Sequence, residues 1–188
     1  MDDVIQAAAE VQTLCQSHGW AFCFIGGVAL QRWSEPRETV DVDLSLFAGF
    51  GHEQEFSDVL LKQFEARIPD AAEFAQHRRV LLLRSSKGVG IDVALAALPY
   101  EALVIQRSSY FEFPPGISLR TCSAEDLIVL KTFAGRGQDW VDVERIIVRQ
   151  TGQLDWKYIR EQLQPLAELK DTPEIIDQLE ARRTEFER

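Results

Sequence analysis

The stretch that most constrains this chain is "TVDVDLSLF" at residues 39–47, in which apolar and polar residues alternate with a period of two. Such alternation predicts a β-strand with one polar face. Asp41 and Asp43 would project from that face, about 6.5 to 7 Å apart. The alternate residues would point into the core: Val40, Val42 and Leu44. Two carboxylates this close repel each other unless a cation lies between them, so the pattern predicts either a cation site or a solvated edge strand.

A glycine pair precedes this strand. Gly26 and Gly27 follow "WAFCFI" at 20–25, which predicts a short buried strand, and they open "GGVALQRW", which predicts a short helix. Glycine in a strand-to-helix turn lets a phosphate approach the main chain, and the helix start offers free N–H groups. Neither G-x-G-x-x-G nor G-x-x-x-x-G-K-[ST] is present, so the dinucleotide and P-loop interpretations fail.

A third acid stands in a later strand. Asp92 lies in "GIDVALAA", which with "RVLLLR" and the intervening "SSKGVG" predicts a hairpin. If this strand lies beside the one with Asp41 and Asp43, three carboxylates face the glycine turn. Hard oxygen ligands in this arrangement suit Mg²⁺ or Mn²⁺ and a bound triphosphate.

The remaining pattern predicts an α/β (α+β) fold, with a mixed β-sheet flanked by helices and a C-terminal helical region packed on it. Ser123 and Gly135 are the predicted cap and end of the first C-terminal helix, and about four helices follow residue 121. The predicted domains are residues 1–121 and 122–188. Other predicted elements are helices at 3–18, 53–68 and 99–107 and strands at 110–113 and 117–121.

Composition narrows the class of protein. The 188 residues carry a net charge of −10, which argues against a broad nucleic-acid-binding face. Cys15, Cys23 and Cys122 are widely spaced and predict buried free thiols. The sequence begins without a basic leader and has no apolar run near the ~20 residues of a membrane span, so we expect a cytoplasmic protein with no membrane partner.

Two sets of motifs resemble a known family. "GGVALQRW", "RETVDVDL" and "IDVALAA" resemble the nucleotidyltransferase fold shared with DNA polymerase beta, in which a glycine pair precedes an acid-x-acid pair and a third acid on a further strand. "SAEDLIVLKTFAGRGQDWVDVERII" resembles the C-terminal motif of the AbiEii-like, MenT-type toxin branch, in which a helical lysine is followed by Asp-x-x-Asp. The matches cover residues 20 to 147 in pieces.

The resemblance implies a role for each matching residue. Gly26 and Gly27 would hold the triphosphate. Asp41, Asp43 and Asp92 would bind Mg²⁺ or Mn²⁺, and Asp92 would deprotonate or orient the attacking hydroxyl.

Further residues carry over from the same resemblance. Lys131 would neutralise charge on the triphosphate, and Asp139 or Asp142 would orient that lysine or the base. Arg37 and Thr39 would bind substrate, as would Asp142. The residue pattern alone leaves other interpretations open: Lys131 as a solvated residue beside an apolar stripe, and the two aspartates as partners of a helix dipole.

The implied activity is metal-dependent transfer of a nucleoside monophosphate from a nucleoside triphosphate to an acceptor hydroxyl, on tRNA or on a protein. The resemblance also implies the toxin of a bacterial toxin–antitoxin pair, with an antitoxin as partner. Val28 and Gln138 differ from the family's usual residues, which motivates the alternative of a non-catalytic nucleotide- or partner-binding member. A metal-dependent phosphohydrolase with water as acceptor is a third hypothesis.

Overall fold

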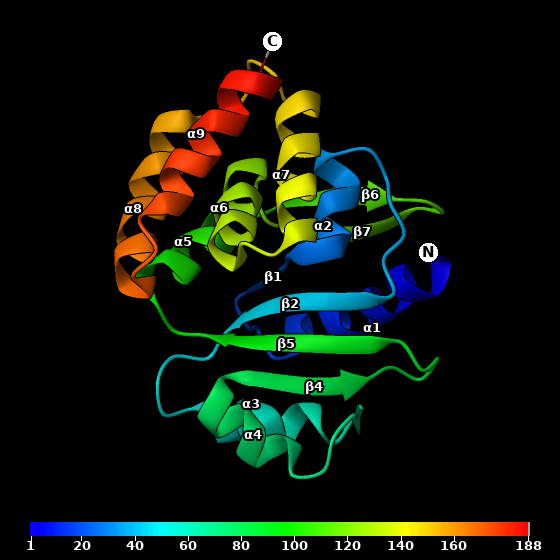
Figure 1. Ribbon diagram of the computed structural model, residues 1–188. Coiled ribbons are helices and arrows are strands. Elements are labelled where there is room, and N and C mark those ends of the chain that lie inside the picture. The colour runs from blue at the N-terminus through cyan, green and yellow to red at the C-terminus, as the bar shows by residue number, and fades with distance from the viewer. Residues whose placement is uncertain (188) are drawn as a thin grey trace. The chain divides into compact units, whose positions relative to one another are not determined.

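The chain forms two compact units in the computed structural model, which describes residues 1–187 (Figure 1). Unit 1 comprises Met1–Val28 and Glu38–Cys122. Unit 2 comprises Ala29–Arg37 and the chain from Ser123 onward. The domain boundary at residue 121 stays a prediction.

Unit 1 is built on a mixed sheet, as predicted. Within residues 1–187 the sheet has seven strands in the order β3-β4-β5-β2-β1-β7-β6. Two of its pairs are parallel, β2 with β5 and β1 with β7, and the others are antiparallel. The strands are β1 (Phe22–Phe24), β2 (Asp41–Phe47), β3 (Glu65–Ala66), β4 (Val80–Arg84), β5 (Gly90–Ala96), β6 (Ser109–Phe113) and β7 (Ile117–Thr121).

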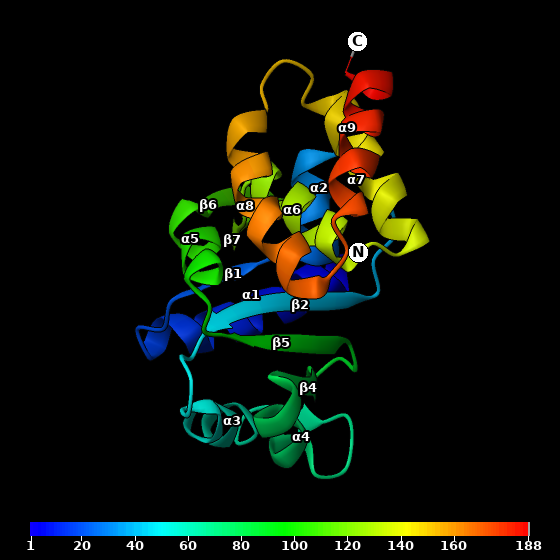
Figure 2. The same cartoon turned by 60° about the vertical axis from the view of Figure 1, so that its left-hand side comes forward.

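The helices of unit 1 cover this sheet. Helix α1 (Asp2–Ser17) packs against β2 and β7, and α5 (Pro99–Arg107) packs against β1 and β2. Helices α3 (Glu53–Leu60) and α4 (Ala71–Arg78) lie side by side, with α4 against β4 (Figure 2). Helix α2 (Gly26–Trp33) starts directly after β1, and the division between the units falls within it. Burial of apolar side chains between these elements supplies the core of unit 1.

Unit 2 contains the predicted C-terminal helices. In the described part of the chain they are α6 (Ala124–Ala134), α7 (Gly137–Arg149), α8 (Trp156–Lys170) and α9 (Glu174–Phe186). Helix α6 packs against the other three. Its start is capped by Ser123 Oγ, which accepts a hydrogen bond of 3.1 Å from the Asp126 backbone N–H, and Gly135 ends it with a φ of 69°. Both predicted signals are confirmed.

Two expectations about local structure are wrong. The predicted helix at 53–68 ends at Leu60, and Glu65 and Ala66 instead form an edge strand paired with β4. Val40, expected in the core, is 72% exposed, because β2 begins only at Asp41 and has no partner strand before that residue. In both places the pairing of distant segments decides the outcome, which a local pattern does not contain.

The cysteines are free and buried, as predicted. Burial raises the pKa of the Cys15 thiol to about 12, so this side chain behaves as a small apolar residue. Over residues 1–187 no helix combines the length and the apolar character needed to cross a membrane.

Candidate active site

Three acidic side chains lie on one face of the sheet at its centre. In the parallel pair of β2 with β5, Asp43 is opposite Asp92 and Asp41 is opposite Gly90. Residues directly opposite each other project to the same face, so the predicted placement of the Asp92 strand beside the other two acids is confirmed. All three acids are partly exposed, whereas Val42 and Leu44 on the opposite face are fully buried.

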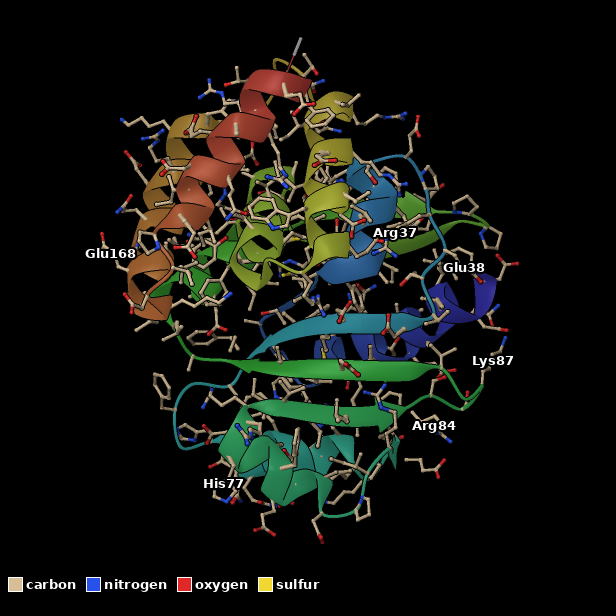
Figure 3. All side chains as sticks on the ribbon, in the orientation of Figure 1. Arg37, Glu38, His77, Arg84, Lys87 and Glu168 are labelled. Carbon is tan, nitrogen blue, oxygen red and sulfur yellow. The ribbon has the colours of Figure 1, made fainter. Side chains whose placement is uncertain are left out.

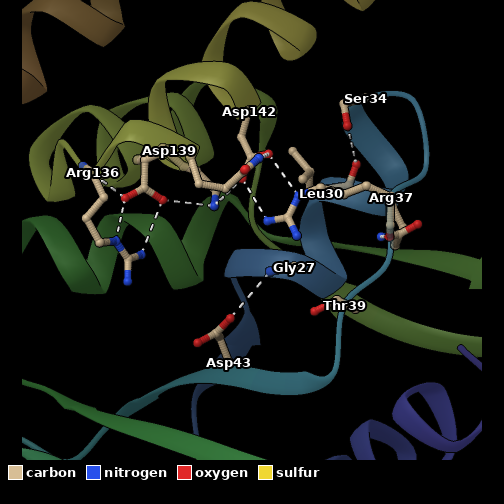
Figure 4. Close-up of polar contacts among 12 residues, drawn as sticks. Gly27, Leu30, Ser34, Arg37, Thr39, Asp43, Arg136, Asp139 and Asp142 are labelled. Carbon is tan, nitrogen blue, oxygen red and sulfur yellow. Dashed lines mark hydrogen bonds and ion pairs between the residues drawn. The ribbon is translucent and has the colours of Figure 1, made fainter.

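The glycine turn lies against these acids. The Ile25 backbone N–H donates to the Asp43 carbonyl at 3.0 Å, and the Gly27 N–H lies 3.4 Å from Asp43 Oδ2 (Figure 4). Gly26 has a φ of 54°, and a Cβ added there would come within 1.9 Å of Asp43 Oδ2. Glycine is therefore required at position 26, both by the backbone conformation and by the carboxylate beside it.

Thr39 lies beside both the glycine turn and Asp41. A Cβ on Gly27 would meet Thr39 Oγ1 at 2.2 Å. The Thr39 hydroxyl donates to the Asp41 carbonyl and to Asp41 Oδ1, at 3.3 and 3.4 Å. The structure thus brings together, within unit 1, the residues for which the resemblance implies phosphate and metal contacts: Gly26, Gly27, Thr39, Asp41, Asp43 and Asp92.

Sequence reasoning missed one residue of this face. Arg67, directly after β3, places Nη2 2.5 Å from Asp92 Oδ1. The position was predicted to be helical, and only the pairing of β3 with β4 carries it towards Asp92. No local signal in the sequence marks it.

The donor set of this face fits a hard divalent cation in part. Asp41 and Asp43 supply carboxylate oxygens on one partly exposed face, which is the chemistry that Mg²⁺ and Mn²⁺ prefer. Within residues 1–187 no group of three or more His, Cys, Asp and Glu side chains is placed to hold a metal ion. Asp92, the third predicted ligand, is instead paired with Arg67.

A second cluster, in unit 2, contains Lys131, which is buried with 7% of its surface exposed. Its Nζ lies 3.1 Å from Asp139 Oδ1 and 2.7 Å from Asp142 Oδ2. Arg37 binds Asp142 with two hydrogen bonds of 2.9 Å, and Arg136 binds Asp139 through Nε at 2.6 Å (Figure 4). We call these five side chains the lysine network. The solvated interpretation of Lys131 is wrong, because its ammonium group is enclosed by two carboxylates.

The lysine network keeps its carboxylates ionised. Burial by itself would raise the pKa of Asp139, but hydrogen bonds and charge from Arg136 and Lys131 outweigh burial and hold the pKa below its usual range. Burial would also raise the pKa of Asp142. Hydrogen bonds from Arg37, Lys131 and Gln138, together with the charge of Lys131, outweigh burial and lower this pKa. With both aspartates ionised, three cations face two anions, which leaves one positive charge in excess among the five side chains.

The two residues that differ from the family's usual pattern have structural roles. Val28 is fully buried and belongs to the core of unit 1. Gln138 donates from Nε2 to Asp142 Oδ1 at 3.1 Å, so it supports the lysine network as a neutral donor. Sequence reasoning gave no role to Arg136, although its spacing of three residues from Asp139, at a helix start, is a signal for a reciprocal contact.

Comparison with protein families gives one match over most of the chain. A family model described as "Nucleotidyl transferase AbiEii toxin, Type IV TA system" matches residues 13–187. Comparison with curated proteins gave no match.

Solved structures resemble this chain at low sequence identity. An antigenic nucleotidyltransferase-like protein from Paracoccidioides brasiliensis is 18% identical, with a TM-score of 0.52 over 96% of this chain and 93% of that one. The lincomycin-bound lincosamide antibiotic adenylyltransferase LnuA is 12% identical, with a TM-score of 0.46 over 75% of this chain and 94% of its own. The antibiotic-resistance factor ANT(2'')-Ia is 16% identical, with a TM-score of 0.46 over 97% and 90%. The first of these likenesses supports the predicted nucleotidyltransferase fold.

Proposed function

Because the chain belongs to the AbiEii nucleotidyl transferase toxin family of type IV toxin–antitoxin systems, we propose that it transfers a nucleoside monophosphate from a nucleoside triphosphate to an acceptor hydroxyl. One observation carries the proposal. Asp41, Asp43 and Asp92 share a face of adjacent strands beside a turn in which Gly26 has no room for a side chain.

In this reaction the acceptor oxygen forms a bond to the α-phosphorus, and the bond from that phosphorus to the bridging oxygen breaks to release pyrophosphate. The glycine turn would let the triphosphate approach the main chain, and Asp92 would orient the attacking hydroxyl and accept its proton. Asp41 and Asp43 would hold Mg²⁺ or Mn²⁺, which when bound supplies positive charge to the phosphates.

The lysine network gives the second part of the proposal. Lys131 and its two arginine neighbours carry one positive charge more than the paired aspartates, and a triphosphate is the anion that the family's reaction requires. Lys131 would neutralise charge on the leaving pyrophosphate, while Asp139 and Asp142 fix the position of its ammonium group. The proposed acceptor is tRNA or a protein, and the proposed partner is a cognate antitoxin.

Labelled nucleotides test the proposal. The protein is incubated with each of the four nucleoside triphosphates labelled at the α-phosphate, with Mg²⁺ or Mn²⁺, and with total tRNA or cell protein as acceptor. We expect label on one class of acceptor, and a fall of at least about 100-fold in rate for Asp41→Asn/Asp43→Asn, the size of effect seen when transition-state charge stabilisation is lost.

Asp58→Asn is the matched control, because it removes a carboxylate from an exposed position of α3. It should transfer label at the rate of the unaltered protein. Full activity of the folded double variant would contradict the proposal. Nucleotide binding without transfer to any acceptor would support the non-catalytic alternative, and release of free nucleoside monophosphate would support a phosphohydrolase.

A further inference from the structure

Asp41, Asp43 and Asp92 form what we call the acidic face of the sheet. Arg67 lies in the same row of paired residues as Asp92 and Asp43, and the proposed function gives it no role. Its backbone N–H donates to the Leu82 carbonyl at 2.9 Å, and Leu82 is the partner of Asp92 in the pairing of β4 with β5. Asp92 in turn is opposite Asp43. A single row across the sheet therefore runs from Arg67 through Leu82 and Asp92 to Asp43.

The sheet leaves space for the Arg67 guanidinium group. A Cβ added to Gly90 would lie 2.4 Å from Arg67 Nη1 and 3.8 Å from the Cβ of Asp41. Any other residue at position 90 would therefore displace either the guanidinium or its neighbours. Because Gly90 has no side chain, the Arg67 guanidinium group can lie over it, near Asp41.

The ion pair is accessible and direct. The side chains of Arg67 and Asp92 are 28% and 33% exposed, and Nη2 lies 2.5 Å from Oδ1. A carboxylate oxygen that accepts this hydrogen bond must give it up before it can bind a cation. The positive charge of the Arg67 guanidinium group also repels a divalent cation that approaches the carboxylates on this face.

We propose that Arg67 is a positioning residue that holds Asp92 in an ion pair and so weakens divalent-cation binding by the acidic face when no nucleotide is present. The proposal rests on the proposed function, because it takes Asp41 and Asp43 as cation ligands, to which Asp92 is added once Arg67 releases it. Its consequence is that the cation arrives together with the phosphates of the nucleotide rather than before them.

Titration with Mn²⁺ in the absence of nucleotide, followed by calorimetry or by the electron paramagnetic resonance of the free ion, tests the proposal. Arg67→Gln should bind Mn²⁺ about tenfold more tightly than the unaltered protein, since the change releases the Asp92 carboxylate and removes the positive charge in contact with it. Arg67→Lys keeps the charge and should stay close to the unaltered protein. Arg67→Gln/Asp92→Asn should lose the gain, because the gain requires the released carboxylate.

Arg84→Gln is the matched control. Arg84 ends β4 opposite Gly90 and is exposed (Figure 3). Its replacement removes one positive charge nearby and leaves the pair of Arg67 with Asp92 in place. It should change the affinity much less than Arg67→Gln does. Thermal melting of each variant checks the fold.

The possible failures are distinguishable. If the unaltered protein binds Mn²⁺ through Asp41 and Asp43 and folded Arg67→Gln binds it equally or more weakly, the role of Arg67 is overturned and the proposed function stands. If neither protein binds Mn²⁺, the role of Arg67 is overturned, because its removal then exposes no cation site. The proposed function is tested separately, by the labelled-nucleotide assay of Asp41→Asn/Asp43→Asn.

Discussion

Gly26 combines a positive φ with direct proximity to the Asp43 carboxylate. Gly26→Ala should destabilise the protein by about 1 to 2 kcal/mol through the positive φ alone, and by more because the new methyl group displaces Asp43. We expect nucleotidyl transfer to fall with the displacement of this carboxylate. Thermal denaturation and the labelled-nucleotide assay measure the two effects.

Gly19→Ala separates the two causes. Gly19 has a similar positive φ of 65°, but an added Cβ there would have no atom within 4 Å. This variant should show the strain of the backbone and keep its activity. Equal activity of folded Gly26→Ala and Gly19→Ala would contradict the link between the turn and Asp43.

Single residues also show which features of the site could be predicted from the sequence and which could not. The alternation of β2 predicted which face Asp41 and Asp43 share, because period-two patterning reflects strand geometry. It could not predict that Lys131 is buried, since a lysine beside an apolar stripe is equally typical of a solvated helix edge. Arg67 was missed because its contact with Asp92 depends on two strand pairings remote in sequence.

At the level of elements, segments with strong local signals were predicted well, the short strands β1, β6 and β7 included, whereas the predicted helix at 53–68 ended early and β3 was missed. The hairpin of β4 and β5 and the helix α6 follow strong local signals, a glycine-containing turn and a serine cap. Strand β3 has only two residues and exists through its pairing with β4. Its sequence carries no alternation from which a strand could be predicted.

Strand β2 gives a prediction about stability. Leu44→Ala should lower the free energy of unfolding by roughly 2 to 5 kcal/mol, because Leu44 is fully buried in the core of unit 1. Val40→Ala removes a side chain that is 72% exposed and should change stability by less than about 0.5 kcal/mol. Chemical denaturation of both variants measures the difference, and similar losses would contradict a strand that begins at Asp41.

At the scale of the whole molecule, the lysine network makes stability depend on pH on the acid side. The pKa values of Asp139 and Asp142 lie below the usual value of 3.8 in the folded protein. Their contribution to stability is therefore fully present above that value and is lost as the pH falls through the folded-state pKa values. Melting temperatures of the unaltered protein should fall steeply below about pH 4.

Asp142→Asn tests this assignment. At neutral pH the variant should lose roughly 3 kcal/mol, since it removes one partner of a buried ion pair, and its melting temperature should fall less on further acidification. Asp2→Asn, at an exposed position in α1, is the control and should keep the acid-side slope. An unchanged slope in Asp142→Asn would contradict the role of the network.

The order in which the chain is synthesised determines when contacts between distant residues can form. Asp92 joins Asp43 only after α3, β3, α4 and β4 have been synthesised. The pair of Arg37 with Asp142 joins residues 105 positions apart. A polypeptide released early by the ribosome thus has the glycine turn but lacks the third acid or the lysine network. Synthesis therefore sets the order in which the two clusters can form: the three acids can meet only after residue 92 has been made, and the lysine network only after residue 142.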